Sequence, residues 1–194
     1  MIGRLSGTLL SKQPPLLLID VHGVGYEVEA PMSTFFHLPA AGESVVLHTH
    51  LVVREDAQLL FGFATLPEKT LFRELIKISG VGPKVALAVL SGISVEDYWA
   101  TVRSGETGRL VKLPGIGKKT AERLVLEMRD KAGASTDLLP GNPTVPQGAL
   151  AEARSALASL GYKPAEVQRL TDAVYKDGMS TEAIIQEALK RALR

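Results

Sequence analysis

The first third of the chain consists of short apolar runs separated by turn residues. Each run is rich in β-branched or large aliphatic side chains, and turn clusters such as Gln13-Pro14-Pro15 lie between the runs. This spacing predicts strands joined by tight turns, with one brief helical stretch near residues 31–37. Five strands of this length favour a small closed barrel. They are expected at Gly7–Leu10, Leu16–Val21, Tyr26–Glu29, Ser44–Val53 and Leu59–Phe63.

From residue 67 onward the apolar positions recur every three or four residues, which predicts amphipathic helices. Pro83 stands where a helix accepts proline at its first position, and Ser94 with Asp97 has the spacing of a capping box. At least one of Tyr98 and Trp99 is expected in the core, because aromatic side chains dominate core burial. The predicted helices are Pro67–Ile78, Lys84–Leu90, Val95–Arg103 and Lys118–Lys131.

The last third of the chain begins with a segment that has no periodicity. Residues 133–148 combine three prolines with Gly, Ser, Thr, Asp and Asn, which is typical of a flexible linker. Residues 149–194 then contain three amphipathic stretches. A bundle this small has marginal stability alone, so a docking module is expected here rather than a catalytic domain.

These patterns together predict a multidomain α+β protein with four parts. Residues 1–66 form a β-barrel of the OB type, although other small barrels share the strand count. Residues 67–132 form a helical domain, residues 133–148 a linker, and residues 149–194 a small, UBA-like three-helix bundle.

Composition narrows the class of protein further. Of 194 residues, 45% are hydrophobic and 22% are charged, which indicates a globular protein, and the lack of cysteine excludes disulfides and cysteine-based zinc sites. No apolar run approaches the roughly 20 residues needed to cross a bilayer, and the first residues lack the pattern of a signal peptide. We therefore expect a cytoplasmic protein with no membrane partner.

The net charge of +1 is unevenly distributed. Residues 1–66 hold three Lys or Arg against six Asp or Glu, residues 67–132 hold twelve against eight, and residues 133–194 hold seven of each. The basic excess in the central segment gives modest support for contact with nucleic acid.

The helical part of the chain contains one short pattern twice, 35 residues apart. Residues 75–86 read LIKISGVGPKVA, and residues 110–121 read LVKLPGIGKKTA. Both copies end an apolar helical stretch at a Gly-hydrophobic-Gly turn and start a new helix with lysine in its first turn. The pattern resembles the helix-hairpin-helix family, whose modules bind the sugar-phosphate backbone of DNA without reading its sequence.

The chemistry of this turn suits a phosphate group. Glycine permits a positive φ and a close approach of the backbone to a ligand, and the new helix offers free N–H groups at its positive end. A nearby lysine adds a full charge. The candidate DNA-binding residues are Gly80, Gly82, Gly115 and Gly117 through their backbone, and Lys84, Lys118, Lys119 and Arg123 through their charge.

Glu55 and Asp56 are adjacent acidic residues at the tip expected between two strands. A solvated turn is the ordinary interpretation, because Asp is a common turn residue. Two carboxylates could also ligate Mg²⁺, or they could repel phosphates. A single pair of charges at ~5 Å in water contributes only roughly 0.8 kcal/mol, so repulsion matters only where several copies converge.

Other candidate sites have incomplete patterns. His48 and His50 share a strand face but lack a clear third ligand, which a catalytic zinc site needs. Residues 115–120 resemble a phosphate-binding P-loop, but Lys112 stands where its first glycine belongs. We therefore expect no metal, no cofactor and no catalytic residue in this chain.

Over its whole length the chain is similar to the RuvA family, which binds Holliday junctions in bacterial branch migration complexes. The similarity covers residues 1–7, the segment Val24-Gly25-Tyr26, the tip Arg54–Phe63, both Gly-x-Gly hairpins, the linker and the Leu160-Gly161-Tyr162 bundle. The resemblance implies sequence-independent binding of four-way junctions in DNA recombination and repair.

The resemblance also implies an assembly and partners. It implies a homotetramer around a four-fold axis, with two tetramers on one junction as the open alternative. Glu55 and Asp56 would form an acidic pin at the junction centre, with Arg54 beside it as a further phosphate contact. Residues 149–194 would recruit a RuvB-type hexameric ATPase, and a RuvC-type resolvase is a further implied partner.

Two other classes of function remain open from the sequence. A structure-selective nuclease or glycosylase often carries such hairpins, but it requires a catalytic site that the sequence does not display. A protein-interaction scaffold with incidental hairpins predicts no affinity for DNA.

Overall fold

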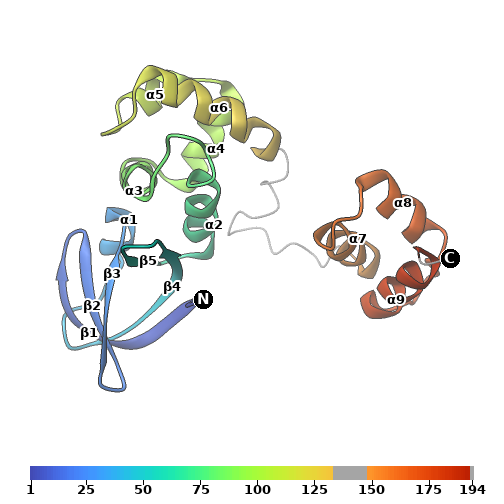
Figure 1. The fold of residues 1–194 in the computed structure, drawn as a ribbon, viewed down its shortest axis with the longest axis horizontal. Coiled ribbons are helices and arrows are strands. Elements are labelled where there is room, and N and C mark those ends of the chain that lie inside the picture. The colour runs from blue at the N-terminus through green and yellow to red at the C-terminus, as the bar shows by residue number, and fades with distance from the viewer. Residues whose placement is uncertain (133–147, 193–194) are drawn as a thin grey trace. The chain divides into compact units, whose positions relative to one another are not determined.

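The computed structural model of the protein describes residues 1–132 and 148–192, so nearly all of the predicted linker lies outside the described residues (Figure 1). The chain divides into two compact units, Met1–Pro140 and Gly141–Arg194. The first unit contains a β-barrel followed by helices, and the second contains helices alone.

Five strands close into a barrel in the order β1-β2-β3-β5-β4, as predicted for the OB type. All neighbouring pairs are antiparallel except β3 with β5. A bulge at Leu10 shifts the register of β1 against β2, which bends the strand as closure requires. The strands are β1 Arg4–Gln13, β2 Leu16–Val21, β3 Val24–Glu29, β4 Ser44–Val53 and β5 Gln58–Phe63.

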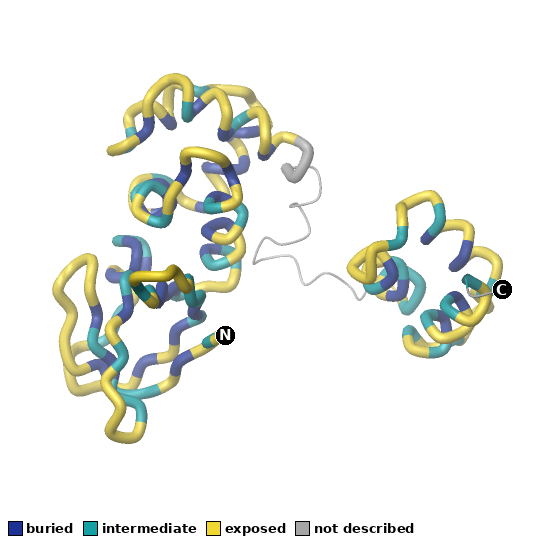
Figure 2. Tube along the Cα trace, in the orientation of Figure 1, coloured by how far each residue is buried: buried dark blue, intermediate teal, exposed yellow. Residues whose placement is uncertain are grey.

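The barrel is filled by side chains that alternate inward along each strand, and Figure 2 shows this alternation of buried and exposed positions. Two strands have the bounds that were predicted for them, Leu16–Val21 and Ser44–Val53. Strand β1 is longer than the predicted Gly7–Leu10, because the polar residues at its exposed ends interrupt the apolar pattern on which the prediction rested. The interior is formed by Leu5, Leu9, Leu17, Ile19, Val28, Ala30, Phe35, Val45, Leu47 and Leu60.

Strand β5 is buried on both faces. Leu60 points into the barrel, while Phe61 and Phe63 belong to the core of the helices. Both rings lie with their centroids 4.9 Å from that of Phe72 on α2. At Gly62 an added Cβ would lie 2.6 Å from Val28 inside the barrel, so the close packing there leaves no room for a side chain.

The helical part of the first unit surrounds a second core. Leu71, Tyr98, Leu124 and Met128 are among its fully buried residues, and Trp99 is also buried, so both aromatic residues of α4 are core residues. Figure 1 shows α2 and α3 on the side of the barrel, with α5 and α6 farther from it. The helices are α1 Met32–Phe35, α2 Leu66–Leu75, α3 Pro83–Gly92, α4 Val95–Ser104, α5 Thr107–Val111 and α6 Lys118–Ala132.

The helix ends show where local signals act. Helix α2 starts at a full capping box between Thr65 and Glu68, and it ends three residues before the predicted Ile78. Ser94 caps α4, its Oγ accepting from the N–H of Asp97 at 3.1 Å, but among the described residues no return bond from Asp97 completes the predicted capping box. The short helix α5 is the apolar helical stretch expected before the second Gly-x-Gly, and its bounds were not predicted because its five residues complete hardly more than one turn.

The second unit is a bundle of three helices, as predicted. Its core is formed by Leu157, Val167, Leu170 and Ala188. The guanidinium of Arg154 donates to the carboxylate of Asp172 at 2.5 Å and links the first helix to the second. The helices are α7 Ala149–Ser159, α8 Pro164–Asp172 and α9 Thr181–Ala192.

Among the described residues, no single helix is long and apolar enough to cross a bilayer. In the same part of the chain, α3 and α4 are together long and apolar enough to do so, but a bend of 98° separates the two helices.

Candidate nucleic-acid interface

The first Gly-x-Gly forms the turn between α2 and α3. The N–H of Val81 donates to the carbonyl of Ile78 at 3.0 Å, which closes the turn, and Gly80 has a φ of +85° that an L side chain rarely adopts. Gly82 then serves as N-cap of α3 in an extended conformation without a side-chain cap. Since glycine has no side chain that could accept these bonds, the first turn of α3 presents its free N–H groups to an outside acceptor.

The second Gly-x-Gly repeats this geometry between α5 and α6. Ile116 donates to the carbonyl of Leu113 at 3.2 Å, and Gly115 has a φ of +79°. The first hydrogen bond of α6 runs from the N–H of Ala121 to the carbonyl of Gly117 at 2.9 Å. The N–H of Ala86 makes the same bond to Gly82 in the first copy. The repeat seen in the sequence is therefore a repeat of structure.

The two glycines of each pair serve different purposes. The first needs a left-handed backbone, whereas the second has no positive φ. A Cβ added at Gly82 or Gly117 would meet nothing within 4 Å in the protein. Packing therefore does not explain these two glycines. Each of them leaves open surface at a helix N-terminus, a place that favours an anion.

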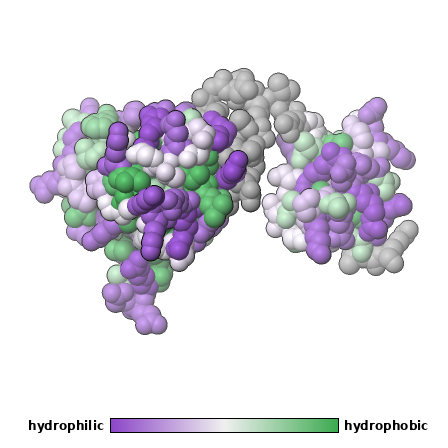
Figure 3. All heavy atoms as spheres, turned by 90° about the horizontal axis from the view of Figure 1, so that it is seen from above, coloured by the Kyte–Doolittle hydropathy of each residue, from purple (hydrophilic) through white to green (hydrophobic). Residues whose placement is uncertain are grey.

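The predicted lysines surround these helix starts. Lys84, Lys118 and Lys119 are exposed, and each lies within the first turn of α3 or α6. Lys84 also lines a crevice of about 390 Å³ between α3 and the barrel, which it shares with Glu29. Figure 3 looks down on the end of the first unit where α5 and α6 lie, and hydrophilic side chains cover much of that face.

The two hairpins are in contact with each other. Nη1 of Arg123 on α6 donates to the carbonyl of Ser79, in the first turn, at 2.7 Å. On the other side, Cγ2 of Val85 on α3 lies beside Gly115 in the second turn, 3.8 Å from where a Cβ added to that glycine would be. Each turn thus touches the second helix of the other hairpin. The sequence gives no signal for these contacts, because the partners are far apart along the chain.

Arg123 therefore has a structural partner in addition to its predicted role. One of its N–H groups is used by Ser79, and the side chain remains exposed. Since a guanidinium carries five N–H donors, the contact with Ser79 is compatible with a simultaneous contact to phosphate.

The acidic pair lies at the tip of the β4–β5 hairpin, as predicted. The N–H of Arg54 donates to the carbonyl of Ala57 at 2.8 Å and closes this tip. Arg54, Glu55 and Asp56 are all exposed. Across the described residues no ion pair joins the acidic tip to the lysines of the hairpins.

His50 on β4 packs against α2. The ring of His50 meets the edge of Phe72 with a centroid distance of 5.9 Å, and its Nδ1 is buried without a hydrogen-bond partner among the described residues. Burial, with smaller contributions from the charges of Arg73 and Lys69, lowers the pKa of His50. Within the described ranges no group of three or more His, Asp or Glu could hold a metal ion.

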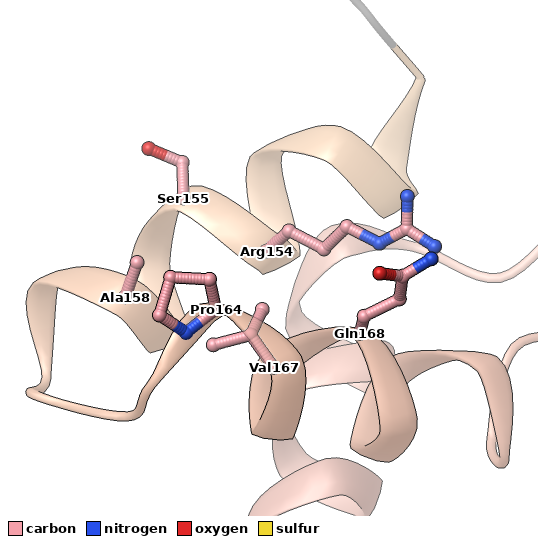
Figure 4. A pocket seen from close by; sticks show the side chains of 6 residues that line it. All are labelled: Arg154, Ser155, Ala158, Pro164, Val167 and Gln168. Carbon is pink, nitrogen blue, oxygen red and sulfur yellow. The ribbon is translucent and has the colours of Figure 1, made fainter. Parts of the chain in front are cut away.

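The second unit has a groove between α7 and α8 of about 410 Å³ (Figure 4). Ala158, Pro164 and Val167 form its apolar part, and the polar ends of Arg154 and Gln168 lie at the other end. Leu170 and Ile184 are buried inside this unit. Tyr175 is 39% exposed, because it lies beyond the C-terminal end of α8.

Three family models match the chain. They are described as RuvA N terminal domain, SAM-like helix-hairpin-helix tandem, and RuvA C-terminal domain, and they match residues 1–62, 72–130 and 148–193. The second match spans both hairpins, and the first contains the acidic tip.

Curated relatives align with the chain from end to end. The Holliday junction branch migration complex subunit RuvA of Thioalkalivibrio sulfidiphilus is 54% identical over 201 residues, which cover 100% of both chains. The subunit of the same name from Stutzerimonas stutzeri is 52% identical over 198 residues, covering 98% of each chain. That from Escherichia coli O1:K1 is 52% identical over 203 residues, covering 100% of both. With its barrel, its tandem hairpins and its C-terminal bundle all matched in this order, the chain belongs to the RuvA family.

Proposed function

We propose that this protein binds four-way DNA junctions through their sugar-phosphate backbone and serves as the junction-binding subunit of a branch migration complex. The observation that carries the proposal is the pair of open helix starts at Gly82 and Gly117, held together by Arg123. The end-to-end similarity to subunits with that name supports it.

The four predicted parts of the chain take separate roles in this proposal. Residues 67–132 bind phosphates through the backbone at Gly80, Gly82, Gly115 and Gly117 and through the lysines. Residues 1–66 hold the subunits together, residues 133–148 act as a tether, and residues 149–194 dock the motor. The exposed side chain of Arg54 adds a phosphate contact beside the acidic tip.

The acidic tip acts as a pin when several copies meet. Glu55 and Asp56 are exposed, and one copy repels a phosphate only weakly in water. In a homotetramer around a four-fold axis, the tips converge and their charges keep the strands apart at the crossover. A second tetramer on the opposite face of the junction is the alternative arrangement.

The protein itself is non-catalytic in this proposal. A RuvB-type ATPase supplies the work of branch migration and docks on residues 149–194, where the groove between α7 and α8 offers an apolar floor with polar ends. A RuvC-type resolvase, which would cleave the junction, is the further partner.

The test is a gel-shift titration with a four-way junction and a linear duplex of matching sequence. We expect a strong preference for the junction that survives a change of arm sequence. Affinity should fall with salt, with a slope of roughly −0.9 per phosphate neutralised. Equal affinity for both DNAs, or an affinity that does not change with salt, would contradict the proposal.

Two further measurements address the other classes of function. Labelled junction incubated with the protein and Mg²⁺ should remain intact, whereas cleavage would indicate a nuclease. Removal of residues 149–194 should leave junction binding unchanged and abolish stimulation of the motor, and a loss of junction binding would contradict the assignment of separate roles.

A further inference from the structure

The four-residue helix α1 lies between the barrel and the hairpin domain, and each of its residues is attached to a different place. Phe35 is buried in the barrel core. Ser33 bonds to α2, Thr34 to the connection between β5 and α2, and Met32 to α3. A single turn of helix thus joins the barrel to the hairpin domain at three separate points.

The bond to α2 involves a buried carboxylate. Glu68 is only 8% exposed, and its carboxylate accepts from Ser33 Oγ at 2.5 Å. The same carboxylate accepts from the N–H and the hydroxyl of Thr65, both at 3.1 Å, which completes the capping box. Capping α2 requires only Thr65 and Glu68. The additional bond from Ser33 is therefore what connects this helix start to the barrel.

We call the three contacts of α1 with the hairpin domain the joint. Its other two bonds run to the connection between β5 and α2 and to α3. Thr34 is fully buried, and its Oγ1 accepts from the N–H of Ala64 at 3.1 Å, where the chain leaves the barrel. The N–H of Met32 donates to Ser91 Oγ at 3.0 Å, and that hydroxyl donates in turn to the carbonyl of Leu87. Ser91 lies in the last turn of α3, the helix that starts at the first phosphate site.

These contacts lie between two regions that a junction must meet at once. The acidic tip is part of the barrel, whereas both phosphate sites are on the helices. A linear duplex can be held by the hairpins alone, but a four-way junction needs the tip and the hairpins in one fixed orientation. A small rotation at the joint would therefore affect junction binding more than duplex binding.

We propose that Ser33, Thr34 and Ser91 are positioning residues that determine selectivity for junctions over duplexes. The inference rests on the proposed function. The joint is also held by β5, whose Phe61 and Phe63 pack against Phe72, so loss of the α1 bonds changes the orientation of the hairpins without separating them from the barrel.

The test uses the double variant Ser33→Ala with Ser91→Ala in the full-length protein. It removes two bonds of the joint and leaves the capping box, both cores and all lysines in place. We expect the ratio of junction affinity to duplex affinity to fall about tenfold, because two ordinary hydrogen bonds no longer hold the orientation that only the junction requires. Duplex affinity should stay within about twofold of its original value. Energy transfer between dyes on two junction arms should show a wider spread of arm separations.

Two controls separate positioning from general stability. Ser104→Ala removes a hydroxyl that donates to the carbonyl of Thr101 within α4, and it should leave the affinity ratio unchanged. Ser33→Thr keeps the hydroxyl and should preserve the ratio. If the double variant is too unstable to assay, Thr34→Val removes one bond at nearly constant volume and should lower the ratio in the same direction.

The outcomes are distinct. An unchanged ratio in the double variant, with junction preference intact in the original protein, overturns the role of the joint alone. Equal losses of junction and duplex affinity also overturn it, because they indicate general destabilisation. An original protein that does not prefer junctions overturns the proposed function and this inference together.

Discussion

The two hairpins share one twelve-residue pattern but are held in place by different means. The first follows the ten-residue helix α2, which has a complete capping box, and its second helix α3 is bonded to α1. The second follows the five-residue helix α5, which lacks a side-chain cap, and it leads into the fifteen-residue helix α6. The barrel supports the first hairpin, whereas the second packs mainly on α4 and is linked to the first by the bond from Arg123 to Ser79.

The difference shows that a motif determines its own turn but not its place in the molecule. Both turns have a first glycine with positive φ and a second glycine in open surroundings. Their placement depends on contacts outside the motif, such as the bond from Arg123 to Ser79. Charge also differs, because the first turn of α6 holds Lys118 and Lys119, whereas that of α3 holds Lys84 alone.

The largest expected effect tests this difference in charge. Reversal of both lysines in Lys118→Glu with Lys119→Glu should weaken junction binding about a hundredfold, whereas Lys84→Glu alone should weaken it about tenfold, since each charged contact contributes roughly 1.5 kcal/mol or more. A filter-binding titration at fixed salt measures both. Equal losses in the two variants would show that the hairpins contribute alike, and no loss in either would remove the hairpins from the DNA interface.

The glycine pairs allow stability and binding to be separated. Gly80→Ala should lower the free energy of unfolding by about 1–2 kcal/mol, because alanine is strained at positive φ. Gly82→Ala should leave unfolding nearly unchanged and weaken DNA binding, because its Cβ would enter the open space at the helix start. Denaturant unfolding and gel shifts on the same samples compare the two. The corresponding pair Gly115→Ala and Gly117→Ala should behave in parallel, and a different order of effects would show that the turns are not equivalent.

Arg123 tests how far the second hairpin depends on the first. Arg123→Ala should lower the free energy of unfolding by about 1 kcal/mol through loss of the bond to Ser79. If Arg123 also contacts a phosphate, the salt slope of DNA binding should become shallower by about 0.9. An unchanged slope with reduced stability would assign the residue to hairpin placement alone. Arg129→Ala, a change at an exposed position further along α6, is the matched control.

The smallest expected effect concerns the support of the first hairpin by the barrel. His50 packs on Phe72 of α2, and its lowered pKa means that the folded protein favours the neutral ring. The unfolded chain then binds more protons below its ordinary pKa of about 6.5, so stability is complete above that pH and declines as the pH falls. Thermal unfolding between pH 7.5 and pH 5.5, conditions chosen to bracket that value, measures the decline. His50→Gln should flatten it, and an equal decline in that variant would assign the pH dependence to other groups.

Much of this arrangement could be predicted from local patterns. The strands at 16–21 and 44–53 and the Gly-x-Gly turns follow from alternation and from glycine spacing. The bounds of helix α5 could not be predicted, because one turn gives no periodicity. The predicted start of α2 at Pro67 is one residue late, although Thr65 and Glu68 have the spacing of a capping box.

What could not be predicted depends on partners that are distant in sequence. The bond from Arg123 spans 44 residues, and the bond from Met32 to Ser91 spans 59. Nothing in the neighbouring residues distinguishes Ser33 from an ordinary exposed serine. The run from Leu59 to Phe63 predicts a buried strand, but an unbroken apolar run does not show which side chain faces which core.

Strand β5 has a consequence for the way this protein can be divided or made. Because Leu60 fills the barrel while Phe61 and Phe63 fill the helical core, the barrel cannot bury its last strand completely until the helices are present. A fragment ending at residue 63 would expose two aromatic rings on a strand face, which is the kind of surface that promotes aggregation. During synthesis the same face must wait for α2 to leave the ribosome. The boundary between barrel and helices is therefore visible in the sequence, yet it is a poor place to cut the chain.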